Sequence, residues 1–108
     1  MILCAFTDYE HFPRSCVSGY NIEKFQGKSL SSCKAMCMAK VDCLAFEYGV
    51  SNGGSGNFVP EDCILNSSAD KKGCDGSYHN LDLYIKKGKQ LLVLDYLWQI
   101  KMVRKGFF

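Results

Sequence analysis

Seven cysteines give this 108-residue chain its clearest capacity for chemistry. Three of them follow the spacing Cys33-x3-Cys37-x5-Cys43, and Cys63 begins the apolar run Cys-Ile-Leu. Cysteine thiols form disulfides, bind zinc or act as nucleophiles, and each use needs different surroundings. The choice among the three uses therefore depends on the elements that carry these cysteines.

Two of the cysteines lie in a predicted helix. Ser29 is a suitable N-cap residue, and the helix would run from it to about residue 40. Cys33 and Cys37 are four residues apart, so they share one helix face. The same inner stripe contains Leu30 and Met36.

The remaining two cysteines of the motif begin predicted strands, at 43–48 and 63–66. A last strand is expected at 81–86, and short strands separated by turns between residues 4 and 27. The glycine- and asparagine-rich segment 49–60 is expected to be a flexible hairpin connection. Within the strand at 43–48, alternation predicts a helix-facing side with Cys43 and Ala45, and an opposite side with Leu44, Phe46 and Tyr48.

A helix with two thiols on one face, followed by two strands with one thiol each, indicates a helix stapled to a sheet by disulfides. Such a framework is typical of proteins outside the cytosol. Structural zinc fits less well, because the spacing lacks a Cys-x2-Cys knuckle and neither His11 nor His79 has a partner at ligand spacing. A cytosolic protein with reduced thiols is the other alternative.

Composition limits the classes of function. The length fits one domain, and the formal charge of +2 comes from scattered lysines and arginines, which does not resemble a nucleic-acid footprint. The apolar run after Met1 is too short for a signal peptide, so we expect a secreted protein or ectodomain whose signal lies outside this chain. Residues 91–108 are apolar but too short and too charged to insert as a membrane span, and would be a partner-docking or interfacial helix or an appendage foreign to the domain.

A combination of motifs carries a family resemblance: Gly19-Tyr20-Asn21, Phe25-x-Gly27-Lys28-Ser29-Leu30, Cys33-x3-Cys37-x5-Cys43-Leu44-Ala45-Phe46-Glu47-Tyr48, Cys63-Ile64-Leu65 and Leu83-Tyr84-Ile85-Lys86. Together they resemble the PAN/apple domain superfamily over roughly residues 9–87. The resemblance implies an α+β fold, a small disulfide-rich domain with a curled antiparallel β-sheet packed around a single α-helix. It implies an N-terminal flank at 1–8, the domain at 9–87 and a C-terminal tail at 88–108.

The resemblance also implies the disulfide pairing. Its two signature bridges would be Cys33–Cys63 and Cys37–Cys43, and apple repeats add a third bridge that joins the two ends of the domain. Cys16 occupies the N-terminal position of that third bridge, but Tyr84 stands at about the C-terminal position and Cys74 lies ten residues earlier. We therefore expect Cys16–Cys74 as a displaced version of this bridge. Cys4 is then the odd thiol, free or paired outside this chain.

By the same resemblance, the expected function is a non-catalytic extracellular module that binds a protein or a glycan as part of a larger secreted or membrane-anchored protein. A structural spacer or self-association module is the alternative, and a thiol-dependent enzyme fragment, using Cys4 with His11 or His79, a remote one. We expect no cofactor and no metal. Asn66-Ser67-Ser68 predicts glycosylation at Asn66. The candidate contacts for an anionic ligand are Lys24, Lys28, Lys71, Lys72, Lys86 and Lys87.

Overall fold

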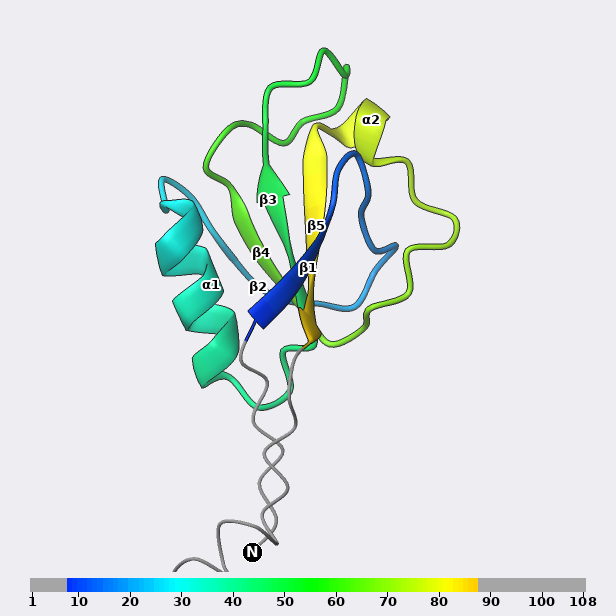
Figure 1. Cartoon of the computed structure of the whole chain (residues 1–108). Helices are drawn as coiled ribbons and strands as arrows, with labels where there is room; N and C mark the ends of the chain where they lie inside the picture. Colours follow the sequence, from blue (N-terminus) through cyan, green and yellow to red (C-terminus); the bar gives the residue numbers. More distant parts are fainter. Residues whose placement is uncertain (1–7, 88–108) are drawn as a thin grey trace, which may run out of the picture. The chain divides into compact units, whose positions relative to one another are not determined.

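The computed structural model describes residues 8–87, which form a five-stranded sheet with a helix of three turns and a second helix of a single turn (Figure 1). The strand order is β1-β5-β3-β4-β2, and the pairs β2–β4, β3–β4 and β3–β5 are antiparallel. The α+β fold expected from the sequence is therefore confirmed. The elements are β1 (Asp8–Phe12), β2 (Asn21–Phe25), α1 (Leu30–Ala39), β3 (Ala45–Gly49), β4 (Cys63–Asn66), α2 (Gly76–His79) and β5 (Leu81–Lys87).

Helix α1 begins where the cap predicts. The Ser29 hydroxyl accepts a hydrogen bond of 3.1 Å from the backbone N–H of Ser32, which satisfies one of the free donors of the first turn. Cys33 and Cys37 are the buried residues of the helix, and Leu30 and Met36 pack beside them against the core. The predicted inner stripe thus lies against one face of the sheet.

The core between α1 and the sheet is aromatic. Phe46 of β3 stacks on Tyr84 of β5 with ring centroids 4.8 Å apart, and Tyr9 of β1 meets Phe46 edge-on at 4.9 Å. The predicted sides of β3 were wrong, because Phe46 and Tyr48 lie on the helix side with Cys43, whereas Ala45 lies on the opposite side. Cys43 precedes the first residue of β3, so the alternation of the strand does not extend back to it.

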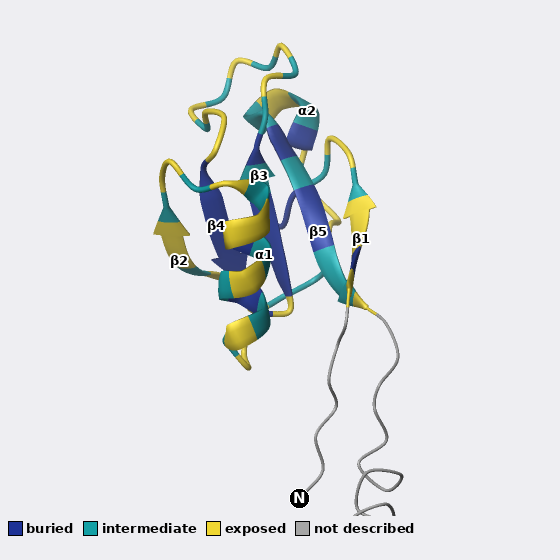
Figure 2. Ribbon diagram, turned by 60° about the vertical axis from the view of Figure 1, so that its left-hand side comes forward, coloured by how far each residue is buried: buried dark blue, intermediate teal, exposed yellow. Residues whose placement is uncertain are grey.

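The sheet face turned away from α1, called the far face below, is also covered. Ile64 and Leu81 pack there with Cys16, and Ala45 and Leu83 pack with Val17. The cover comes from the segment between β1 and β2 and the loop between β4 and α2, which lie side by side in Figure 1. Strands β3 and β4 are consequently buried on both faces, whereas the edge strands β1 and β2 are mostly exposed (Figure 2).

The glycine-rich connection between β3 and β4 joins two antiparallel neighbours, as the expected hairpin connection would, and it is packed against the segment around α2. The N–H of Gly54 donates to the Asn80 side chain at 2.8 Å, and Asn80 returns a hydrogen bond of 3.1 Å to the Gly54 carbonyl. A Cβ at Gly54 would collide with the backbone carbonyls of Ser77 and Tyr78. Glycine is therefore needed at this position because the loop lies directly on the backbone of α2.

Candidate functional site

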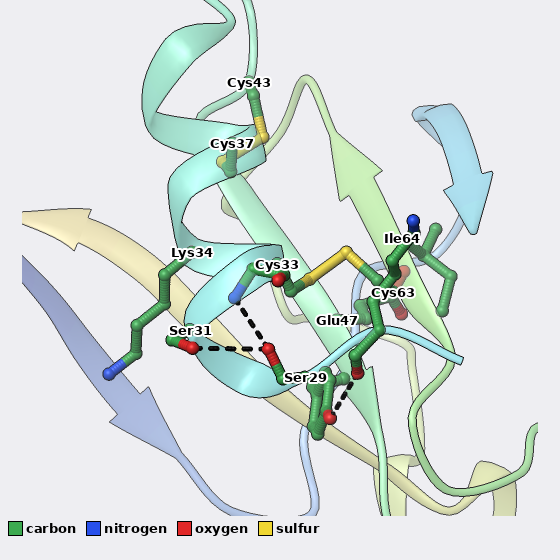
Figure 3. Close-up of a disulfide and its surroundings, with 12 residues drawn as sticks. Ser29, Ser31, Cys33, Lys34, Cys37, Cys43, Glu47, Cys63 and Ile64 are labelled. Atoms are coloured by element: carbon green, nitrogen blue, oxygen red, sulfur yellow. Dashed lines mark hydrogen bonds between the residues drawn. A yellow bond between two sulfur atoms is a disulfide. The ribbon is translucent and has the colours of Figure 1, made fainter. Parts of the chain in front are cut away.

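Three disulfides hold the domain together, and they join the pairs that the family resemblance implied. Cys33–Cys63 ties α1 to β4, with Cα atoms 5.8 Å apart, and Cys37–Cys43 ties the end of α1 to the segment before β3 (Figure 3). Cys16–Cys74 joins the two segments that cover the far face. Cys4 lies outside the described residues.

These bonds leave no thiol among residues 8–87 to act as a nucleophile or zinc ligand, since the six cysteines of that range are oxidised. His11 bonds to the carboxylate of Asp82 at 2.8 Å and stacks on Tyr84 at 4.4 Å. His79 packs edge-on against Phe58, at 6.2 Å. Both histidines have structural contacts, and the structure places neither beside a nucleophilic sulfur.

A pocket of about 210 Å³ opens on the far face. Its walls come from the 17–19 segment, from Phe58 in the packed loop, and from Leu81. The disulfide residue Cys74 and the ring of His79 complete the lining, and Glu47 of β3 provides its buried acid. Elements distant in the sequence therefore meet here, and the Cys16–Cys74 bond fixes two of them to each other.

Glu47 is the unusual residue of this pocket, because it is an acid in a central strand with only 3% of its surface exposed. One carboxylate oxygen accepts a hydrogen bond from the Val17 N–H at 3.1 Å, and the other from the Asn66 side chain at 3.0 Å. Burial raises the pKa of the Glu47 carboxyl group, and these two hydrogen bonds partly offset the effect. Both oxygens act as acceptors, which is the pattern of a carboxylate.

Glu47 has no cationic partner in the described part of the chain. The ion pairs found there join His11 to Asp82, Lys24 to Asp62 and Lys40 to Glu23. The carboxylate oxygen and the sulfurs of Cys16 and Cys74 lie within 4.8 Å of one another. Those sulfurs are bonded to each other, so the trio does not offer the thiolates that a zinc site requires.

Two exposed tyrosines flank the pocket in sequence. Tyr20 lies between Gly19 and Asn21, which both line the pocket, and 67% of its surface is exposed. Its backbone has φ 61°, a conformation that non-glycine residues seldom adopt, and its carbonyl accepts a hydrogen bond from Ser67. Tyr78 precedes the pocket residue His79 and is 52% exposed. Both are candidates for ligand contact, because exposed aromatic side chains are typical of recognition surfaces.

The six candidate lysines do not form one patch. Lys24 and Lys86 lie on different strands and at different levels along the sheet. Lys24 pairs with Ile64 of β4, which pairs with Glu47 of β3. Lys86 follows Ile85, which pairs with Ala45, the first residue of β3. Three of the lysines have contacts within the domain. Lys24 lies 3.9 Å from Asp62, the ammonium of Lys71 lies 3.8 Å from the ring centroid of Phe12, and that of Lys86 donates to the Lys40 carbonyl.

The other three lysines have less constrained side chains. Lys28 is half-buried, and its backbone bonds to Glu61 and Tyr48, whereas Lys72 and Lys87 are exposed. A ligand role for any of the six therefore stays a prediction, and the structure does not gather them into one anion site.

In the folded domain, the side chain of Asn66 is not accessible for the glycosylation that the sequon predicts, and its modification stays a prediction. Asn66 is 0% exposed, and its side-chain nitrogen, the atom to which a glycan would be attached, donates to Glu47 and to the Ile64 carbonyl. This burial could not be predicted from the sequence, because the sequon stands where β4 meets a polar loop. A glycan on that nitrogen would replace at least one of these two hydrogen bonds.

The pocket itself was missed at the sequence level, although one signal pointed to it. In the run Leu44-Ala45-Phe46-Glu47-Tyr48, Glu47 is the single charge inside a strand that the sequence already marked as apolar. A charge at a core position breaks the local pattern, and such breaks occur preferentially at functional sites. The walls of the pocket come from distant segments, which no local pattern connects.

Comparison with known proteins gives a single finding. The family model described as PAN domain matches residues 4–87. No curated protein and no solved structure matches the chain significantly. Within the described residues, neither helix is long and apolar enough to cross a membrane.

Proposed function

This chain belongs to the PAN domain family, whose members are generally protein- or carbohydrate-binding modules of extracellular proteins, and from that premise we propose that it is a non-catalytic recognition module of a larger secreted or membrane-anchored protein. The three disulfides support an extracellular location, because such bonds persist in oxidising compartments. The expected partner is an extracellular protein or glycan.

One observation carries the proposal: the loops around the far-face pocket are fixed to one another. Asn52, Gly54 and Asn80 bond the connection between β3 and β4 to α2 and the residue that follows it. The Cys16–Cys74 disulfide joins the other two covering segments. A surface that is already ordered loses little conformational entropy on binding, which is the property of a preorganised recognition site.

The test is a binding assay on the oxidised 108-residue chain. The oxidised protein would be applied to a glycan array and, in parallel, used as bait for extracellular proteins. The double variant Tyr20→Asn and Tyr78→Ser removes the exposed rings of two residues that are adjacent in sequence to the pocket lining, and asparagine tolerates the left-handed backbone at position 20. Val41→Ser is the matched control, because Val41 is 96% exposed and follows α1.

The expected result is a ligand that the wild type and Val41→Ser retain and that the double variant loses. If all three proteins retained the same ligand, the binding surface would lie away from the two tyrosines and the pocket. A specific turnover of substrate by the wild type would overturn the non-catalytic assignment.

A further inference from the structure

The far-face pocket contains a buried negative charge without a positive partner. Only 3% of the surface of Glu47 is exposed. No lysine, arginine or histidine of residues 8–87 lies within 4.0 Å of its carboxylate. A buried charge is costly unless it is paired, and two neutral hydrogen bonds compensate it only in part. The pocket therefore has an unused capacity for a cation.

A second buried acceptor lies beside that carboxylate. The amide nitrogen of Asn66 donates to Glu47, and the oxygen of the same amide is buried with no hydrogen-bond partner in the described part of the chain. Buried polar atoms are nearly always hydrogen-bonded, so an unpaired one indicates a missing donor. Asn66 does not line the pocket itself, so Glu47 is the group that offers the pocket negative charge, and it calls for a ligand that brings positive charge and N–H donors.

The walls of the pocket restrict the shape of that ligand. Val17, Phe58 and Leu81 line it with apolar surface, and at 210 Å³ it is smaller than the sites of about 300–1,000 Å³ that take drug-sized molecules. Apolar walls beside a buried carboxylate match a flexible hydrocarbon stem that ends in an ammonium group. An anionic sulfated sugar would instead meet the uncompensated charge of Glu47.

We propose that this pocket receives the side chain of a lysine from a protein partner, with the ammonium paired to the Glu47 carboxylate and the methylene stem packed between Val17, Phe58 and Leu81. This inference rests on the proposed binding function and specifies its ligand chemistry. Lys24 does not fill this role from within the chain, because its ammonium lies 3.9 Å from Asp62 and 4.8 Å from the centroid of the Phe58 ring.

The test uses Nα-acetyl-lysine methylamide as the probe and follows amide resonances of the oxidised full chain by NMR. We expect saturable shifts at Val17 and at the Asn66 side-chain amide. Acetylation of the probe at Nε removes its charge and should weaken binding about tenfold or more. Glu47→Gln should weaken it by a similar factor, whereas Glu10→Gln, which removes an exposed acid on β1, should leave it unchanged.

A second measurement needs no variant. Butylammonium should displace the lysine probe from the wild type and 1-butanol of equal length should not. Equal displacement by the two would overturn the proposal, as would probe binding that survives Glu47→Gln. Methyl glucoside shifting the same resonances more strongly than the lysine probe would assign the pocket to a glycan. If the lysine probe fails while the Tyr20 and Tyr78 variants still lose their ligand, the lysine inference is wrong and the binding function stands.

Discussion

The side-chain amide of Asn66 donates a hydrogen bond of 3.0 Å to the carboxylate of Glu47 across the β3–β4 pair, on the far face of the sheet. Neither group is on the surface, since Asn66 is 0% and Glu47 3% exposed. The same contact makes Asn66 inaccessible to a glycan and holds the carboxylate at the pocket. It also links the stability of the domain to the protonation of Glu47.

The first prediction follows from the raised pKa of Glu47. The folded state binds the proton of this group more tightly than the unfolded state, in which the carboxyl group has its ordinary pKa of 4.5. The contribution of Glu47 to stability is therefore fully present below pH 4.5 and is lost as the pH rises through the folded pKa. The unfolding free energy of Glu47→Gln should therefore rise relative to that of the wild type as the pH increases from 4.5 through the folded pKa of Glu47. Parallel curves would contradict the prediction.

The second prediction ranks the disulfides. Their sequence separations are 58 residues for Cys16–Cys74, 30 for Cys33–Cys63 and 6 for Cys37–Cys43. The loop-entropy model converts these to roughly 4, 3.5 and 2 kcal/mol of stabilisation. Paired serine variants should therefore lower the melting temperature in that order, by about 4–8 °C per kcal/mol. A larger loss for the Cys37–Cys43 pair than for the other two would show that packing, not loop length, sets the ranking.

The third prediction concerns Gly54. Gly54→Ala places a methyl group against the carbonyls of Ser77 and Tyr78, so the loop must move off α2. The expected cost is about 1–3 kcal/mol, typical of overpacking. Hydrogen exchange should accelerate at the Gly56 amide, which donates to the Tyr78 carbonyl at 2.8 Å. Ser55→Ala, at an exposed neighbouring position, is the control and should change neither quantity.

The fourth prediction concerns the domain boundary, which stays a proposal. The family match ends at residue 87, and β5 ends at Lys87. Truncation after residue 88 should therefore leave the melting temperature and ligand binding unchanged, as differential scanning calorimetry and the binding assay would report. A loss of 4–8 °C, the size of about 1 kcal/mol for a domain of this length, would show that residues beyond 88 belong to the folded unit.

The sequence predicted the fold where its signals are local. The Ser29 cap and the four-residue spacing of Cys33 and Cys37 are enough to position α1, because capping and helical periodicity act within a turn. The sides of β3 were predicted wrongly from Cys43, which lies two residues before the first strand residue, Ala45. Cys43 lies outside the strand, so the direction of its side chain does not follow the alternation of β3, and using it as the reference reversed the assignment of every side chain in the strand.

The site was less predictable for a different reason. Its lining combines Val17, Glu47, Phe58 and His79, which become neighbours only after the strands have paired and the Cys16–Cys74 bond has joined two distant segments. The sequence suggested lysines as ligand contacts because it shows where the positive charges are. It did not suggest Glu47, because the burial of a side chain is a property of the tertiary structure.

The strand order has a consequence for how the chain reaches its native state. Both edge strands, β1 and β2, come from the first 25 residues, and each has a single neighbour, β5 and β4 respectively. During synthesis these two segments must wait, unpaired, until residues 63–87 have emerged. Contacts of such long sequence separation slow folding. The N-terminal segment of the domain thus stays available to chaperones and to other chains until β4 and β5 have been synthesised.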